Sequence, residues 1–239
     1  MPPQFYQTPP ARLAGVIYLL IAVFGGFSIG YVPSAIVAAS PASTAANLAG
    51  NMSLFHAGIV ADIFVLLLEV ILTAILYVVF APVSKTLAMV AALARISMVL
   101  VMAINLLIYI TPMFLLSGVS FLSGFEQDTL QAIAYAMFLL HDMGIYLWQL
   151  FFGLHLLALG YMIVKSTLFP HLLGWMMLVG SFGYSLQGFA KILGIEISAL
   201  DWVIIGLLVI VTLGELAFAF RLLIKGHGSG QKQASPSAT

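Results

Sequence analysis

The stretch "GIYLWQLFFGLHLLALGYMIV", from Gly144 to Val164, carries one histidine, His155, in an otherwise almost wholly apolar run. At about 1.5 Å of rise per residue, a helix of this length matches the roughly 30 Å hydrocarbon core of a bilayer. The stretch therefore predicts a transmembrane helix. It also raises the question of which partner the histidine ring finds, because a polar side chain in lipid needs one.

The whole chain has the composition of an integral membrane protein. Of its 239 residues, 63% are hydrophobic and 7% are charged, whereas soluble domains carry about 25% charged residues. The lipid bilayer is therefore the expected partner. A net charge of zero argues against nucleic acid, which is bound by basic surfaces. The absence of cysteine excludes disulfides, thiolate metal sites and cysteine nucleophiles.

Hydropathy divides the chain into six segments, each at or above the roughly 18 apolar residues that a membrane span requires. They are Leu13–Gly30, Ala57–Phe80, Leu87–Ile110, Gly144–Val164, Leu172–Leu193 and Trp202–Ile224. We therefore expect an all-α, polytopic six-helix transmembrane bundle that forms a single domain over residues 1–225. Residues 226–239 are rich in glycine, serine and polar residues, and they are expected to form a disordered cytoplasmic tail.

The sequence does not determine the structure of two regions. Apolar, helix-compatible sequence extends the fourth segment back to Thr129, and a single helix from there to Val164 would be about 54 Å long. Such a helix must tilt, bend near Gly144, or begin outside the hydrocarbon core. The connection from Val32 to Phe55 is long and rich in small residues, and we expect it to fold back over the bundle.

Pairs of small residues recur inside the predicted helices. In lipid, small residues let two helix backbones approach closely. We therefore predict that these pairs mark helix–helix interfaces. The pairs are Gly26 with Gly30, Gly153 with Gly160, and Ser181 with Ser185.

The basic residues in the loops and at the segment ends fall mainly on one predicted side of the membrane. Three of the loops contain Lys191 alone. The N-terminus, the other two loops and the tail contain Arg12, Lys85, Lys165, Arg221, Lys225 and Lys232. Lysine and arginine are enriched in segments that stay in the cytoplasm. Both termini are therefore predicted to be cytoplasmic, and the expected location is a bacterial inner membrane.

Four ionisable residues are predicted to share one level of the membrane. Counted along each helix from its cytoplasmic end, they lie about 14–16 Å deep. They are Glu69, Arg95, His155 and Glu215. Because charged groups in lipid pair with one another, Glu69 is expected to pair with Arg95, and Glu215 with His155. This buried polar layer is the candidate ligand or ion site.

A second polar layer is expected nearer the outside. It consists of Asp62, Asn105, His141 and Asp142. Asp62 lies seven residues before Glu69 and hence on the same helix face. His56 and His141 each precede the cytoplasmic end of their helix by 24 residues, so they are expected to meet near the outer rim. These two histidines are the candidate metal ligands.

Three functions remain open for these residues. The buried layer suits a binding or transport-type bundle that acts on a small molecule, an ion or a proton, because intramembrane acids and histidines often mark such paths. The second alternative is a haem-b or metal-binding redox protein, since thirteen residues separate His141 from His155, a spacing that allows one helix to serve two stacked haems. In the third, the polar layers only fix the shape of an accessory subunit of a membrane complex or of a homo-oligomer.

The sequence motifs favour a protein without catalytic residues. The chain contains no His-Glu-x-x-His motif and no Walker loop. An intramembrane metallohydrolase remains an alternative by ligand type alone, with His56, Asp62, His141 and Asp142 as its metal ligands. The first expectation is a protein without a cofactor, and haem b or a metal ion is the alternative.

Three stretches carry a resemblance to a known family. They are "ARLAGVIYLL" (Ala11–Leu20), "NLAGNMSLFHAGIVADIF" (Asn47–Phe64) and "FFGLHLLALGYMIVKSTLFPHLLGWMMLVGSFGYSL" (Phe151–Leu186). Together they resemble the bacterial multi-pass membrane-protein family known as domain-of-unknown-function family 4386. The likeness extends from Ala11 to about Leu223, and His141 and His155 match positions that the family favours. Where His56 stands, the family more often carries arginine, which weakens the His56–His141 metal site. The resemblance implies a fold and a membrane location, and no activity.

Overall fold

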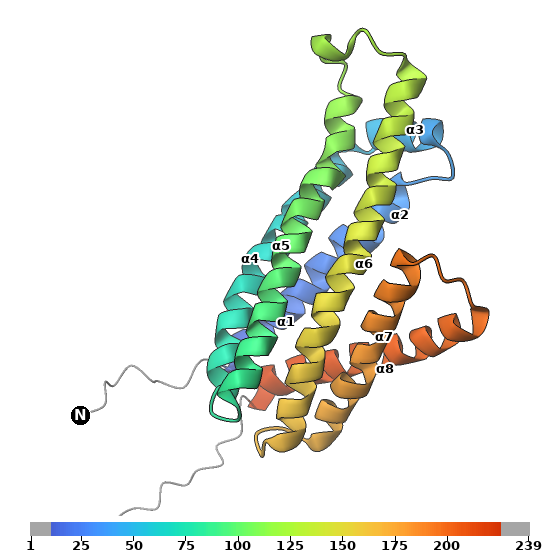
Figure 1. Ribbon diagram of the computed structural model, residues 1–239. Coiled ribbons are helices and arrows are strands. Elements are labelled where there is room, and N and C mark those ends of the chain that lie inside the picture. Colours follow the sequence, from blue (N-terminus) through green and yellow to red (C-terminus); the bar gives the residue numbers. More distant parts are fainter. Residues whose placement is uncertain (1–10, 226–239) are drawn as a thin grey trace, which may run out of the picture.

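The computed structural model describes residues 11–225, whose regular structure is entirely helical (Figure 1). This confirms the all-α class; the predicted tail, residues 226–239, lies outside the described residues. One long helix comprises α1 (Ala11–Gly25), the π-helical turn η1 (Gly26–Tyr31) and α2 (Val32–Ile36). The other elements are α3 (Pro41–Gly50), α4 (Met52–Phe80), α5 (Lys85–Leu115), the 3₁₀ turn η2 (Ser120–Leu122), α6 (Gln127–Lys165), α7 (His171–Ile192) and α8 (Ser198–Lys225).

Local sequence signals set several helix ends. The hydroxyl of Ser40 accepts a hydrogen bond from the Ser43 amide at 3.2 Å and so caps α3. The hydroxyl of Ser84 accepts one from the Leu87 amide at 3.3 Å and caps α5. Beyond α7, Gly194 adopts a positive φ of 66°, a conformation that commonly ends helices because glycine has no Cβ.

The six long helices form a ring in chain order. The helix that starts with α1 packs against α4, α4 against α5, α5 against α6, α6 against α7, α7 against α8, and α8 returns to α1. The start of α1, the α4–α5 turn, the α6–α7 turn and the end of α8 lie at the same end of the bundle (Figure 1). At the opposite end the α5–α6 hairpin extends beyond α7.

Within residues 11–225, five helices are long and apolar enough to cross a membrane: the helix Ala11–Ile36, α4, α5, α6 and α8. The chain is therefore a membrane protein by the length and composition of its helices. Helix α7, which contains most of the predicted segment Leu172–Leu193, is not among them. At about 33 Å for 22 residues it is long enough, but glycines, serines and Gln187 lower its apolarity.

Helix α6 is continuous through Gly144, the position at which the sequence left a bend open. It runs without interruption for 39 residues, about 58 Å. Gly144 lies within it, and a Cβ at Gly144 would collide with the side-chain amide of Asn105 on α5. The glycine therefore makes room for a polar side chain crossing between helices, and it does not interrupt α6.

The predicted small-residue interfaces are only partly correct. On α6, a Cβ at Gly153 would lie 2.5 Å from the Ser185 hydroxyl, and one at Gly160 would lie 2.6 Å from the Leu178 backbone nitrogen. Both glycines therefore bring α6 and α7 into close contact. The prediction is wrong for Gly26 and Gly30, because a Cβ at either position has no other atom within 4 Å.

The connection from Val32 to Phe55 folds back onto the bundle, as expected. Its helix α3 packs against α6 and buries Thr44 and Leu48. Leu48 joins an outer apolar cluster with Phe55 on α4 and Phe138 on α6.

Candidate functional site

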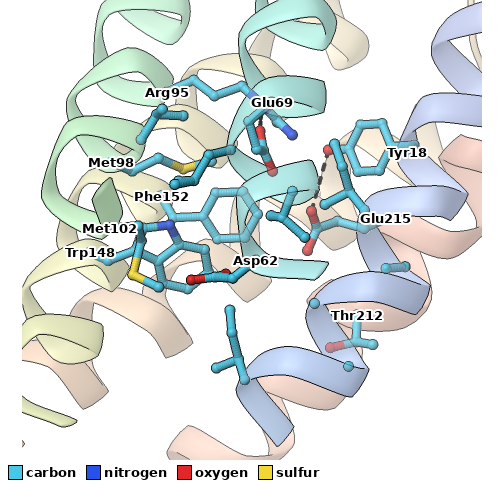
Figure 2. A pocket seen from close by; sticks show the side chains of 18 of the residues that line it. Tyr18, Asp62, Glu69, Arg95, Met98, Met102, Trp148, Phe152, Thr212 and Glu215 are labelled. Carbon is cyan, nitrogen blue, oxygen red and sulfur yellow. Dashed lines mark hydrogen bonds and ion pairs between the residues drawn. The ribbon is translucent and has the colours of Figure 1, made fainter. Parts of the chain in front are cut away.

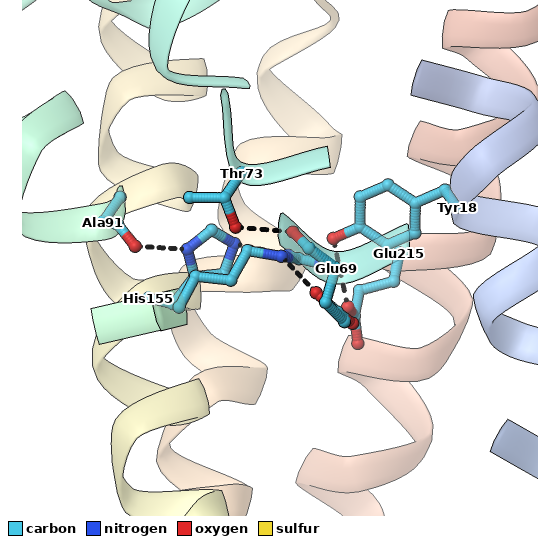
Figure 3. A network of polar contacts seen from close by, with 7 residues as sticks. Tyr18, Glu69, Thr73, Ala91, His155 and Glu215 are labelled. Atoms are coloured by element: carbon cyan, nitrogen blue, oxygen red, sulfur yellow. Dashed lines mark hydrogen bonds and ion pairs between the residues drawn. The ribbon is translucent and has the colours of Figure 1, made fainter. Parts of the chain in front are cut away.

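Arg95 on α5 is the centre of the polar groups inside the ring, and Figure 3 shows its partners Glu69 and His155. Its side chain is 1% exposed. Its Nε donates to Glu69 Oε2 on α4 at 2.6 Å, and a terminal nitrogen lies 2.8 Å from His155 Nε2 on α6. The structure thus places Glu69 beside Arg95, the partner expected from helix depth. We call Arg95, Glu69 and His155 the Arg95 cluster.

The two contacts of His155 define its tautomer. A guanidinium can only donate, so His155 Nε2 must accept the hydrogen bond from Arg95. The other ring nitrogen, Nδ1, lies 2.9 Å from the carbonyl oxygen of Ala91, which can only accept, so Nδ1 carries the proton. The ring is therefore neutral in this arrangement, and it is stacked nearly parallel to Phe152, with 8° between the planes.

Glu215 does not pair with His155, so that predicted pair is wrong. Its Oε1 instead accepts a hydrogen bond from the Tyr18 hydroxyl on α1 at 3.3 Å (Figure 3). The physical reason lies in the ring order: α7 stands between α6 and α8, whereas α8 packs directly against α1. Depth along the helices indicates a shared level, but it does not indicate which faces meet.

Tyr18 is a member of the site that helix depth did not reveal. Its ring lies 5.2 Å from the Arg95 guanidinium carbon, a position in which an aromatic face attracts a cation. Phe152 on α6 lies 6.0 Å from the same carbon. The sequence signal that could have indicated this role is a tyrosine in the middle of an apolar helix. Its hydroxyl needs a hydrogen-bond partner when it is buried.

A cavity of about 470 Å³ lies inside the ring, beside Arg95 (Figure 2). Most of its wall is apolar, and residues of all six long helices contribute to it. The polar side chains in the wall include Tyr18, Asp62, Glu69, Arg95, Tyr184, Thr212 and Glu215. Small-molecule pockets commonly have volumes of about 300–1,000 Å³ and combine apolar walls with a few convergent polar groups. The cavity has both properties.

The mouth of the cavity lies between the first helix and α8. The lining residues that are exposed are Ala22, Gly26 and Gly30 on the first helix and Thr212 on α8. Gly26 and Gly30 stand in and beside a wide gap, because no atom fills the place of a Cβ at either position. They also lie within the π-helical turn η1; such turns are rare and frequently occur at functional sites.

The predicted outer layer is not one group of contacts. Asn105 donates to the backbone carbonyl of His141 at 2.9 Å, and His141 Nδ1 lies 3.3 Å from the backbone carbonyl of Asn105. The His141 ring also packs on Tyr109, with centroids 4.6 Å apart. Asp142 is exposed, whereas Asp62 is buried and lines the cavity. Only Asn105 and His141 are thus brought together, and they join α5 to α6.

The candidate metal ligands have separate surroundings. His56 is exposed, and its Nε2 lies 3.2 Å from the sulfur of Met113, while His141 is buried against Asn105 and Tyr109. Residues 11–225 contain no group of three or more histidine or acidic side chains that could hold a metal ion. His155 uses both ring nitrogens within the protein, so neither is free to bind haem iron in this arrangement.

The π-helical turn contains a serine motif, Gly26-Phe27-Ser28-Ile29-Gly30, which has the Gly-x-Ser-x-Gly pattern. In hydrolases this motif forms a sharp turn from strand to helix. Here it lies within a continuous helix, in η1. The Ser28 hydroxyl is buried and has no hydrogen-bond partner in the part of the chain that is described. Without the sharp strand-to-helix turn, the motif does not indicate a nucleophile.

The chain also resembles known proteins. A protein of Archaeoglobus fulgidus that is described as uncharacterized is 26% identical to it over 178 residues, which cover 74% of this chain and 89% of that protein. No solved structure matches the chain. The family model described as "Domain of unknown function (DUF4386)" matches residues 13–226. This confirms the resemblance expected from the sequence: the chain belongs to the DUF4386 family.

Proposed function

We propose that this protein binds a small molecule inside the membrane, in the cavity beside Arg95, as a binding or transport-type protein. The observation that carries the proposal is the cavity itself, about 470 Å³ of space with an apolar wall and a few converging polar groups. A bundle whose polar residues served packing alone would be expected to close over this space, because membrane helices associate by van der Waals contact.

The Arg95 cluster supports binding by holding one side of the cavity in a fixed geometry. The guanidinium contacts Glu69 and His155 and lies between the rings of Tyr18 and Phe152. Side chains held from several directions are pre-organised, which lowers the cost of ordering them around a ligand. Through Arg95 and Glu69, the cluster therefore forms one rigid part of the cavity wall, which we call the floor of the site.

The surroundings of the mouth favour entry from the lipid. Val23 beside Ala22 is 67% exposed, and Leu213 beside Thr212 is 55% exposed. Large exposed apolar side chains on a membrane helix face hydrocarbon, where they carry no penalty. A ligand with an apolar body would reach the cavity sideways, between η1 and α8.

The proposed location is a cell membrane of the bacterial inner-membrane type, crossed six times with both termini in the cytoplasm. The distribution of basic residues supports it, since Arg12, Lys85, Lys165 and Lys225 belong to the helix ends that lie together. The chain has no cysteine, so single cysteines can be introduced at will. In intact cells, a membrane-impermeant maleimide should label Ser123→Cys, between α5 and α6, and should not label Lys85→Cys. Labelling of Lys85→Cys from outside the cell would show that the protein has the opposite orientation.

Ligand binding can be tested with the chain's own fluorescence. Of its three tryptophans, Trp148 lines the cavity, while Trp175 and Trp202 are 52% and 74% exposed. Replacing the latter two with phenylalanine leaves Trp148 as the only tryptophan. This full-length protein is titrated in nanodiscs with neopentylbenzene, benzyltrimethylammonium and benzenesulfonate. A saturable change in Trp148 emission with at least one of these probes is expected.

The matched variants are Gly26→Phe and Gly206→Phe. A Cβ at either glycine would have no other atom within 4 Å, so both substitutions should fold, but only Gly26 lines the cavity. Gly26→Phe should abolish the saturable change and Gly206→Phe should preserve it. If no probe binds saturably to the folded protein, or if Gly26→Phe binds as well as Gly206→Phe, the proposed function is wrong.

A further inference from the structure

The wall of the cavity contains more acidic than basic groups. Its carboxyl groups belong to Asp62, Glu69 and Glu215, and its basic group is the guanidinium of Arg95. Arg95 Nε and Glu69 Oε2 form an ion pair at 2.6 Å. Two carboxyl groups, those of Asp62 and Glu215, therefore face the cavity without a cationic side chain of their own among the lining residues.

Asp62 is the more unusual of the two carboxyl groups. It lies on α4, two helical turns before Glu69, and it is 5% exposed. Its Oδ1 is buried and has no hydrogen-bond partner within residues 11–225, and Figure 2 shows the side chain at the cavity. A buried carboxyl with an unpartnered oxygen is costly, and an ionisable residue inside a membrane is by default a candidate for a functional site.

Glu215 also has unused capacity to accept hydrogen bonds. It stands on α8, on the side of the cavity where the mouth opens, and Tyr18 donates to one of its oxygens at 3.3 Å. An ionised carboxyl has about four acceptor sites. A positively charged group in the cavity would therefore find acceptors on α4 and α8, two helices that do not follow one another in the ring.

The apolar part of the wall indicates the size and nature of such a cation. Arg95 faces the rings of Tyr18 and Phe152, but in the described part of the chain no arginine or lysine lies over Trp148 or Tyr184, which also line the cavity. Aromatic faces attract cations. The volume of about 470 Å³ far exceeds that of a bare metal ion and suits a molecule with an apolar body.

From these observations, and resting on the proposed function, we infer that the ligand is an organic cation. Its apolar body would fill the space between Trp148, Tyr184 and the aliphatic wall, and its positively charged group would lie between Asp62 and Glu215. The Arg95 cluster would close the floor and would not contact the charged group, because like charges repel.

The decisive comparison uses two probes of the same shape. Benzyltrimethylammonium and neopentylbenzene differ in one central atom, nitrogen or carbon, and hence in charge. In the single-tryptophan protein the cation should bind about tenfold or more tightly than the neutral molecule, as expected for a quaternary ammonium that meets aromatic faces and carboxylates away from water. Asp62→Asn should reduce this preference at least several-fold. Asp142→Asn, a matched change at an exposed carboxyl outside the cavity, should leave it unchanged.

The outcomes separate this inference from the proposed function. If both probes bind equally and Gly26→Phe blocks both, the cavity is a ligand site but its ligand is not a cation. If benzenesulfonate binds more tightly than the cation, the charge that the ligand meets is that of Arg95, and the inference is overturned. If no probe binds at all, the proposed function is wrong, and the inference that rests on it is wrong as well. Because the wild-type comparison needs no carboxyl variant, it stays decisive even if Asp62→Asn fails to fold.

Discussion

The two sides of the helix ring hold their polar residues in different ways. We call the α5–α6 interface the closed side. There, a terminal nitrogen of Arg95 lies 2.8 Å from His155 Nε2, and the Asn105 side chain donates to the His141 carbonyl at 2.9 Å. On the open side, between the first helix and α8, Tyr18 donates to Glu215 at 3.3 Å beside unfilled space. The difference indicates that contacts on the closed side hold α5 and α6 together, while the open side borders the space in which we propose that a ligand binds.

The largest effect should come from Arg95→Ala on the closed side. The substitution leaves Glu69 buried without its cation, and breaking a buried ion pair by removing one partner costs about 3–5 kcal/mol. The free energy of unfolding, measured by denaturant titration in detergent, should fall by this amount. Combining Arg95→Gln with Glu69→Gln should restore part of the loss, because it removes both charges together.

The counterpart on the open side is Glu215→Gln. This substitution keeps the shape and one acceptor for the Tyr18 hydroxyl, so the free energy of unfolding should change by less than about 1 kcal/mol. Equal losses for Arg95→Ala and Glu215→Gln would erase the distinction between the two sides. Unchanged stability of Arg95→Ala alone would show that the ion pair does not hold the closed side together.

The class of fold and the polar level could be predicted because they depend on one-dimensional quantities. Apolar run length indicates a membrane helix, and the rise per residue gives depth, so Glu69, Arg95, His155 and Glu215 were expected at one level. The structure brings the first three into contact and places Glu215 on the wall of the same cavity.

The partners of Glu215 and the open space at Gly26 could not be predicted in the same way. Both depend on which helices are neighbours in the ring, and local spacing carries no information about that order. His155 and Glu215 share a level, yet α7 separates their helices. Gly26 and Gly153 look alike in sequence, yet one borders a cavity and the other meets Ser185.

Alanine substitutions at two glycines, Gly144 on the closed side and Gly30 on the open side, should differ by an intermediate amount in the free energy of unfolding. A Cβ at Gly144 would collide with the Asn105 amide, so Gly144→Ala should cost about 1–3 kcal/mol, as for overpacking elsewhere. Gly30→Ala meets no atom within 4 Å and should be neutral or stabilising by up to about 1 kcal/mol, because alanine favours helix. Unfolding titrations of both variants provide the check, and a costly Gly30→Ala would show that the cavity is filled by the protein itself.

A small effect is expected for Tyr18→Phe on the open side. The phenylalanine ring can keep its place 5.2 Å from the Arg95 guanidinium carbon, so only the 3.3 Å hydrogen bond to Glu215 is lost, at about 0.5–1.5 kcal/mol. Tyr18→Leu removes the aromatic ring as well, including its edge-to-face contact with Phe218, and should cost more. The two variants thus divide the role of Tyr18 between its ring, which lies beside Arg95, and its hydroxyl, which donates to Glu215. If Tyr18→Phe destabilised the protein as much as Arg95→Ala, the open side would be held as firmly as the closed side, and Glu215 would belong to the structural core.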